Sequence, residues 1–198
     1  MKPNAKEKII KHAIDCIAQN ANAGLDEIAR AAGVGRATLY RHFKSREALL
    51  TELKLSAGNQ LQAAVGPVFN ASLSAREKLE RIVRLLVPMG ASLNVTAYFC
   101  NPIKKEQDPG VMASYETHMG QIRQLCLDLK QEKTLATDTP LVWLVASLTS
   151  LVFTAWEKVE SGDIAPKQAP WLVLGTFLNG HGTPESMAWF NELKEANQ

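Results

Sequence analysis

Hydrogen-bond donors and cations are concentrated between residues 36 and 46 of this chain. Guanidinium, ammonium, imidazole and hydroxyl groups donate hydrogen bonds to phosphate oxygens and to the edges of bases, so their chemistry suits contact with nucleic acid. The candidate contact residues, together with the small residues among them, are Gly35, Arg36, Ala37, Thr38, Tyr40, Arg41, His42, Lys44 and Arg46. These side chains can act together only if a folded element presents them on one face.

Two short helices joined by a glycine-containing turn would provide that element. Apolar residues at helical spacing predict one helix over about residues 25–32 and a second over about residues 36–43. Ala29 is small enough to let the two helices cross closely, and Gly33 suits the turn between them. The spacing therefore predicts a helix-turn-helix whose second helix carries the donors. A helical hairpin with a solvated basic face is the alternative.

The segment of residues 25–50 reads LDEIARAAGVGRATLYRHFKSREALL, and it closely resembles the DNA-binding head of the tetracycline-repressor (TetR) family. The similarity covers roughly the first 55 residues, whereas the rest of the chain matches the family only in the number and length of its helices. The resemblance implies an all-α, homodimeric repressor of about nine helices. It would have an N-terminal three-helix head with a helix-turn-helix and a helical body that binds a small effector.

The resemblance also implies roles for single residues of the head. The family's phosphate contacts would fall on Thr38, Tyr40 and Arg46, and its base-reading positions on Arg36, Ala37, Arg41 and His42. Gly35 stands where the family often has serine, so a hydroxyl that could cap the second helix or touch a phosphate is absent. Glycine is itself an acceptable N-cap, and its backbone N–H remains available for a contact.

The composition and the charge distribution fit a soluble protein with a basic head. Apolar residues make up 46% and charged residues 21% of the 198 residues, which excludes disordered and collagen-like chains. Residues 1–56 hold ten Lys and Arg against six Asp and Glu, and the remainder holds twelve against fourteen. Such a head suits a polyanionic partner. Three cysteines without CxxC spacing, and a start without a signal-peptide pattern, predict a reducing, cytoplasmic location.

The elements of the body follow from capping residues, apolar periodicity and proline or glycine breaks. We divide the chain into a DNA-binding domain over residues 1–46 and an effector-binding and dimerisation domain over residues 47–198. The head begins with a helix over about residues 4–20, and a long helix runs from Ser45 until Gly66 and Pro67 stop it. Further helices are expected over residues 75–87, 93–100, a segment around 112–126, 140–160, 171–178 and from 183 onward, with a loop over 101–110.

Several adaptable or aromatic side chains of the body could line an effector pocket. Thioethers and aromatic rings accept varied apolar ligands, which favours an apolar or cationic-amphipathic effector. The candidates are Met89, Tyr98, Phe99, Met112, Tyr115, His118 and Met119, with Tyr115 and Met119 foremost. Core packing is the alternative for each of them. An ordinary position on the helix surface is the alternative for His118.

An 18-residue stretch from Thr139 to Trp156 carries no charge. It reaches the lower length limit for a membrane helix, but Pro140 and several hydroxyl residues disfavour that interpretation, and we expect no membrane contact. A helix buried all round, in the core or at a subunit interface, is favoured instead. With the helix after it, this stretch fits a dimer surface formed by Trp143, Ser147, Leu151, Thr154, Leu172, Gly175, Thr176 and Asn179. An internal core is the alternative.

Enzyme chemistry finds no support in the sequence. We recognise no GxSxG, HExxH, Walker A or dinucleotide-binding pattern, and His12 and Cys16 lack further ligands at an interpretable spacing, so we expect no catalytic residue, metal or cofactor. The sequence predicts a DNA-binding transcriptional regulator, a ligand-responsive repressor that binds a palindromic operator as a homodimer. The alternatives are an activator, an architectural DNA binder, and a helical carrier or enzyme.

Overall fold

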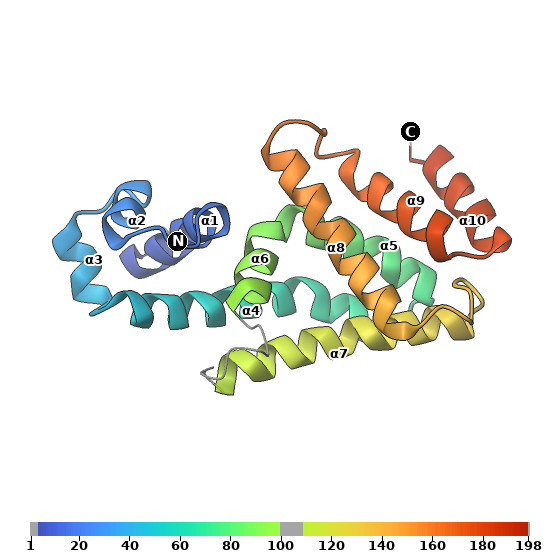
Figure 1. The fold of residues 1–198 in the computed structure, drawn as a ribbon, viewed down its shortest axis with the longest axis horizontal. Helices are drawn as coiled ribbons and strands as arrows, with labels where there is room; N and C mark the ends of the chain where they lie inside the picture. The colour runs from blue at the N-terminus through green and yellow to red at the C-terminus, as the bar shows by residue number, and fades with distance from the viewer. Residues whose placement is uncertain (1–3, 100–108, 198) are drawn as a thin grey trace. The chain divides into compact units, whose positions relative to one another are not determined.

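The computed structural model describes residues 4–99 and 109–197 of the chain. Helices make up the regular structure of these residues, and the predicted all-α class is confirmed (Figure 1). The elements are α1 (Ala5–Gln19), α2 (Leu25–Ala31), α3 (Arg36–His42), α4 (Arg46–Asn70), α5 (Ala75–Leu86), a 3-10 helix η1 (Val87–Met89), α6 (Gly90–Phe99), α7 (Pro109–Gln131), α8 (Leu141–Glu160), α9 (Ala169–His181) and α10 (Pro184–Glu195).

The chain divides into two compact units. The first comprises Met1–Gln62 and Ala91–Glu116, and the second comprises Ala63–Gly90 and Thr117–Gln198. Helices α4 and α7 therefore each contribute residues to both units. The functional boundary after residue 46 stays a prediction.

The core of the first unit forms where α1 packs against α2 and α3. A capping box starts α1, because the Glu7 N–H donates to Asn4 Oδ1 over 2.9 Å and the Asn4 N–H donates to Glu7 Oε2 over 3.2 Å. One stripe of α1 is buried against residues of α2, α3 and α4. The buried side chains include Ile9, Ile14, Ile28, Leu39, Phe43, Leu49 and Leu53. This core fixes the position of α3.

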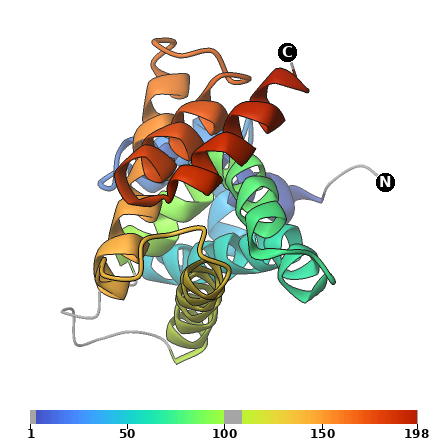
Figure 2. The same cartoon turned by 90° about the vertical axis from the view of Figure 1, so that its right-hand side faces the viewer.

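In the second unit α9 lies between α8 and α10 and also contacts α5 (Figures 1 and 2). Its buried side chains are Ala169, Val173, Leu174, Phe177 and Leu178. Thr183 caps α10, and Pro184 stands in the first turn of that helix, as predicted. Burial of one stripe of α9 against three neighbours accounts for its strongly apolar sequence.

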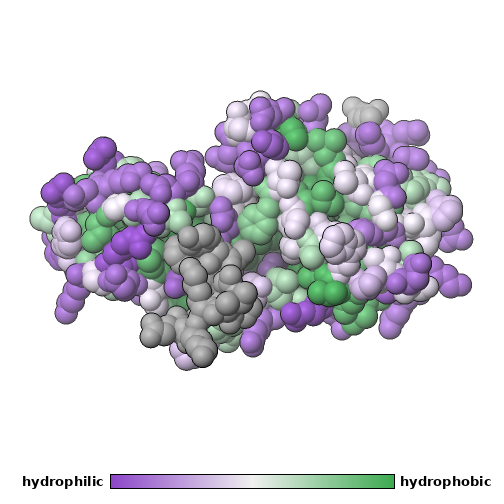
Figure 3. All heavy atoms as spheres, in the orientation of Figure 1, coloured by the Kyte–Doolittle hydropathy of each residue, from purple (hydrophilic) through white to green (hydrophobic). Residues whose placement is uncertain are grey.

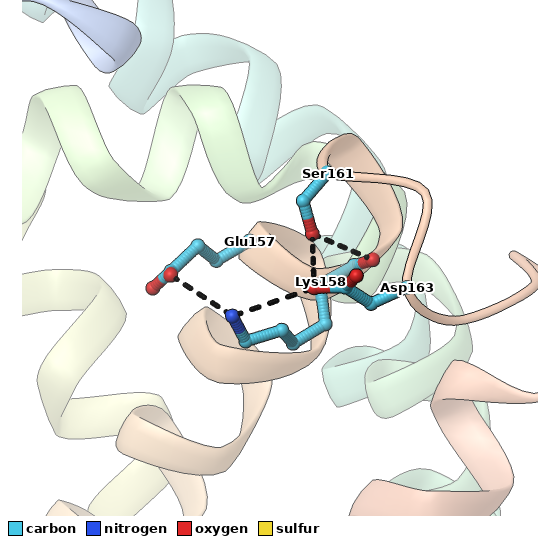
Figure 4. Close-up of polar contacts among 4 residues, drawn as sticks. All are labelled: Glu157, Lys158, Ser161 and Asp163. Carbon is cyan, nitrogen blue, oxygen red and sulfur yellow. Dashed lines mark hydrogen bonds and ion pairs between the residues drawn. The ribbon is translucent and has the colours of Figure 1, made fainter.

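Polar contacts end α8 at the start of the loop to α9 (Figure 4). The Ser161 hydroxyl donates to the Lys158 carbonyl and lies 2.8 Å from Asp163 Oδ2, and Lys158 Nζ is 3.6 Å from the same carboxylate. Gly162 follows with a φ of +81°, a left-handed conformation that glycine adopts without strain. The Ser161 hydroxyl thus gives the Lys158 carbonyl, one of the last carbonyls of the helix, a partner within the chain.

Several predicted helix boundaries differ from the structure. Helix α7 begins at Pro109, inside the loop expected over residues 101–110, of which residues 101–108 lie outside the described part of the chain. Helix α9 spans Ala169–His181 rather than residues 171–178. We expected the long helix to stop at Gly66 and Pro67, but α4 continues through Pro67 to Asn70. Proline in the last turn removes one backbone donor, and Pro67 is exposed here, while the preceding Val65 and Gly66 are buried. Helix α6 begins at Gly90 rather than near residue 93.

Candidate nucleic-acid interface

The predicted helix-turn-helix is present and is built from α2, a tight turn and α3. Gly33 has a φ of +61°, which permits the turn. The Gly33 N–H donates to the Arg30 carbonyl, and the Val34 N–H donates to the Ala29 carbonyl, both over 3.0 Å. Gly35 then caps α3 through its backbone carbonyl, which accepts from the Leu39 N–H over 3.1 Å, and no side chain caps this helix. The turn thus fixes how α3 is presented.

One face of α3 is buried and the opposite face is exposed. Leu39 and Phe43 are 0% and 2% exposed, because they pack into the core of the first unit. The exposed side chains form what we term the α3 face, namely Arg36, Ala37, Tyr40 and Arg41. Thr38 and His42 are half-buried beside it, and Lys44 is exposed just after the helix. The predicted contact residues of the helix therefore share a solvent-facing side.

Arg46 has contacts that the sequence did not reveal. Its Nη2 donates to the Ala21 carbonyl over 2.6 Å, and its Nε donates to the Ala23 carbonyl over 3.3 Å. The guanidinium thus joins the first turn of α4 to the loop between α1 and α2. Its predicted phosphate contact stays a prediction, and the structure adds an internal role. Backbone carbonyls more than twenty positions away leave no signal in a side-chain pattern.

A second unforeseen contact involves Arg36, the first residue of α3. Its Nη2 lies 2.5 Å from Oδ2 of Asp26, which belongs to the first turn of α2. The side chains are 72% exposed for Arg36 and 44% for Asp26. Asp26 was not among the predicted site residues, although a carboxylate in the first turn of one helix and a cation in the first turn of the next were visible in the sequence.

The predicted effector residues are only partly brought together. A groove of about 400 Å³ lies between α7 and α8 in the second unit, and it contains Met119. Its other lining residues are Arg123, Leu141, Val142, Val145, Ala146 and Thr149. Met89 lies on η1, and Met112 and Tyr115 lie on the part of α7 that belongs to the first unit. The side chains of Tyr98 and Phe99 are outside the described residues.

His118 does not lie on the helix surface. It is 7% exposed and shares the buried side of α7 with Ile122, Leu125 and Leu129, so the alternative of an ordinary surface position is wrong. Burial lowers the pKa of His118 from 6.5 to about 4, and its Nδ1 has no hydrogen-bond partner within residues 4–99 and 109–197. The imidazole is therefore neutral near pH 7. The buried positions of α7 lie one residue before Met112 and Met119, at Val111 and His118. A helical pattern aligned on the two methionines therefore does not reveal the burial of His118.

The outward sides of α8 and α9 expose large apolar side chains. Val142, Trp143 and Leu172 are 77%, 60% and 50% exposed, and Figure 3 shows hydrophobic residues along α8 on the face turned to the viewer. Among the predicted interface residues, Thr154, Thr176 and Asn179 are exposed as well, and Ser147 and Leu151 are half-buried. We call this surface the α8–α9 face. Within the single chain, helix α8 is thus buried on one side only, and burial of its other side at a subunit interface stays a prediction.

Gly175 has a packing role inside the chain. A Cβ at this position would lie 3.2 Å from Cζ of Phe190 on α10, so the absence of a side chain allows α9 and α10 to approach closely. Its predicted place in a dimer interface stays a prediction.

Helix α8 is also long and apolar enough, with a mean hydropathy of 1.2 over its most apolar window, to meet the length and composition of a membrane span. Core helices of soluble proteins meet the same criterion. The contacts of α8 with α9 account for its buried side.

Comparison with known proteins finds a sequence family that the head resembles. Residues 9–53 match the family described as bacterial regulatory proteins, tetR family. Two HTH-type transcriptional regulators of Mycobacterium tuberculosis are each 68% identical over 31 residues. That match covers 16% of this chain and 15% of each relative's length, so the chain spans only a small part of these two relatives.

Solved structures share the fold over most of the chain. The TetR-like regulator LfrR of Mycobacterium smegmatis, solved in complex with proflavine, has a TM-score of 0.70 at 23% identity, over 90% of this chain and 97% of its own. The regulator MbdR of Azoarcus sp. CIB has a TM-score of 0.71 at 19% identity, over 89% and 98%. A gamma-butyrolactone receptor reaches 0.68 at 15% identity, over 94% and 92%. At these identities the likeness establishes the fold.

Proposed function

We propose that this chain, a TetR-family regulator by its N-terminal sequence and its fold, binds operator DNA through α3 and represses transcription until a small molecule binds its body. The observation that carries the proposal is the α3 face, in which Arg36, Tyr40 and Arg41 are exposed above a buried Leu39. Positive and hydrogen-bonding side chains on a firmly packed helix are what the major groove of DNA accepts.

The residues of the head divide into two roles in this proposal. Thr38, Tyr40 and Lys44 bind phosphates and set the position of α3, since phosphate contacts carry no sequence information. Arg36 and Arg41 read base edges, with His42 at the margin because its Nε2 is buried. Ala37 allows the close approach of a thymine methyl group, and the exposed Gly35 offers its backbone N–H.

A homodimer is proposed through the α8–α9 face. This face gathers large exposed apolar side chains, among them Trp143 and Leu172. Soluble monomers rarely expose such apolar patches, and where a patch occurs it marks an interaction site. A two-fold axis at this face would pair each helix with its counterpart. Two heads related by that axis would meet successive major grooves about 34–36 Å apart, which implies a palindromic operator.

The groove between α7 and α8 is the proposed effector site. Its lining is apolar except for Arg123 and Thr149, and Arg123 is the charged member. The Thr149 hydroxyl already donates to the Val145 carbonyl over 2.8 Å. A molecule with an apolar body and a negatively charged group fits this lining, whereas the cationic amphiphile considered from the sequence would face a like charge. The whole regulator is proposed to work in the cytoplasm.

Selection from a random pool of duplex DNA tests the proposal. The full chain should enrich a palindromic motif, and footprinting should place that motif over a promoter for a repressor. Arg41→Ala should lose preference at one base pair of each half-site, by about 5- to 150-fold. Arg30→Ala removes an exposed cation from α2, outside the α3 face, and serves as the matched control. Absence of any enriched motif for the unmodified chain would refute DNA reading, and a motif upstream of the promoter would indicate an activator.

A further inference from the structure

We propose that Asp26 fixes the direction of the Arg36 guanidinium and so makes Arg36 a reader of base sequence rather than a phosphate-binding cation. This inference rests on the proposed DNA binding by α3. It assigns to α2, which would otherwise only support the recognition helix, a residue that determines specificity without touching DNA.

The geometry places one carboxylate beside one end of the guanidinium. Asp26 Oδ2 is 2.5 Å from Arg36 Nη2, and Asp26 Oδ1 is buried with no hydrogen-bond partner in the described part of the chain. The recorded contact therefore joins one carboxylate oxygen to one guanidinium nitrogen. Packing of α2 against α3 brings together the first turns of both helices, ten positions apart in sequence. The carboxylate is thus held by the fold and not by a flexible loop.

Arg36 needs a counter-charge in this position. It is the first residue of α3, where the helix dipole disfavours a cation, and α3 has no acidic residue in its own first turn. Asp26 supplies the missing negative charge from the neighbouring helix. An arginine without such a partner, 72% exposed on a flexible stem, would be drawn to the nearest phosphate instead.

The ion pair leaves Arg36 able to bind DNA. A guanidinium has five N–H donors, and the contact with Asp26 uses one nitrogen, so the remaining edge stays available. Holding one end orients the planar fork, which is what bidentate contact with O6 and N7 of guanine requires. The carboxylate also repels phosphate, and this suppresses binding to unrelated DNA. Exposed ion pairs contribute little to folding stability, so the pair is better explained by recognition than by stability.

Two variants that remove the same charge separate these effects. Asp26→Ala removes the carboxylate that pairs with Arg36. Glu27→Ala removes an exposed carboxylate from the same first turn of α2, and Glu27 forms no ion pair within the described residues. Each full-length protein is given a random duplex pool, and its affinity for one fixed non-cognate duplex is measured against salt. Thermal unfolding checks that both variants fold.

Asp26→Ala should lose a guanine preference at one base pair per half-site by about tenfold. Its binding to the non-cognate duplex should tighten, with the dependence of log K on log salt steeper by about one phosphate contact. Glu27→Ala should keep the motif. Arg36→Ala should lose the same base pair, and Asp26→Ala combined with Arg36→Ala should lose no more than Arg36→Ala alone. If Asp26→Ala folds poorly, Asp26→Asn carries the test, because it keeps the shape and removes the charge.

Identical motifs and salt dependences for the Asp26 and Glu27 variants would overturn the inference, since only the general field of the head would then matter. Loss of preference at a base pair that Arg36→Ala leaves intact would overturn it as well. A wild-type chain that enriches no motif would instead refute the proposed DNA reading, so the two failures are distinguishable.

Discussion

At the scale of single residues, Arg46 illustrates how one side chain can hold two segments together. Its guanidinium donates to the carbonyls of Ala21 and Ala23, groups that have few other partners in a short loop. Arg46→Ala should therefore lower the free energy of unfolding by about 1–3 kcal/mol, because charged hydrogen bonds are lost and two carbonyls are left unpaired. Urea denaturation measures this, with Lys44→Ala as a neighbouring cation whose removal should change stability little.

The alternative outcome for Arg46 is equally informative. If Arg46→Ala leaves the unfolding free energy unchanged and weakens binding to all DNA sequences alike, its guanidinium serves the phosphate contact that the family resemblance implied.

The lowered pKa of His118 leads us to expect that the stability of the chain depends on pH. Its pKa is about 4 in the folded chain and 6.5 when unperturbed, so between these values the unfolded chain binds more protons. Stability should thus fall as the pH drops from 6.5 to 4, by about 1.4 kcal/mol per pH unit. His118→Phe removes the titrating group and should flatten the profile over that window. Parallel profiles for the two proteins in urea denaturation from pH 4 to pH 7 would contradict the assignment.

Sequence reasoning at this scale succeeded where a periodic pattern carried the signal. The exposure of Arg36, Tyr40 and Arg41 follows from the helical period set by Leu39 and Phe43. The contacts of Arg46 with distant carbonyls and of Arg36 with Asp26 depend on how α1, α2 and α3 pack, and a single sequence does not encode that packing in any local pattern.

At the scale of elements, two helical glycines predict opposite effects of the same substitution. A Cβ at Gly90 would overlap the Trp156 side chain, whereas a Cβ at Gly120 would meet no atom within 4 Å. Gly90→Ala should therefore destabilise the chain by about 1–3 kcal/mol through overpacking. Gly120→Ala should stabilise it by about 0.5–1 kcal/mol, because alanine is the better helix former. Denaturation midpoints of both variants test the pair, and a loss of stability at Gly120 would show an unforeseen contact on α7.

The α8–α9 face gives an element-scale prediction about assembly. Trp143→Glu should shift the protein from dimer to monomer, because a charge would be buried at a two-fold contact. Leu127→Glu places the same charge on another exposed apolar residue of the second unit, on α7, and should leave the dimer intact. Light scattering across a concentration series distinguishes the two. A stable Trp143→Glu dimer would move the interface elsewhere. Gly175→Glu is a poorer test, since its side chain would clash with Phe190 inside the chain.

Helix boundaries show why elements were predicted better than their ends. Capping residues such as Ser74 and Thr183 marked helix starts correctly, because the cap is a local hydrogen bond. The continuation of α4 past Pro67 and the start of α6 at Gly90 were missed because proline and glycine were taken as breaks, although both residues occur within helical turns here. At Gly90 the Trp156 side chain fills the space that a Cβ would need.

At the scale of the whole molecule, the proposed repression requires that effector binding lower the affinity for operator DNA, although the two bind at different sites. Helix α4 contributes residues to both compact units, and the groove beside Met119 lies in the second. An anionic amphiphile such as decanoate should lower operator affinity by about 1–3 kcal/mol, and linkage requires the operator to weaken decanoate binding by the same factor. Met119→Trp should fill the groove and abolish this response while leaving operator binding intact, whereas Leu127→Trp, outside the groove, should respond normally.

Arg123→Ala should weaken the binding of decanoate far more than the binding of a neutral alcohol of the same length. Anisotropy of a labelled operator, titrated with each ligand, measures all of these, and a fully responsive Met119→Trp would show that the effector binds elsewhere.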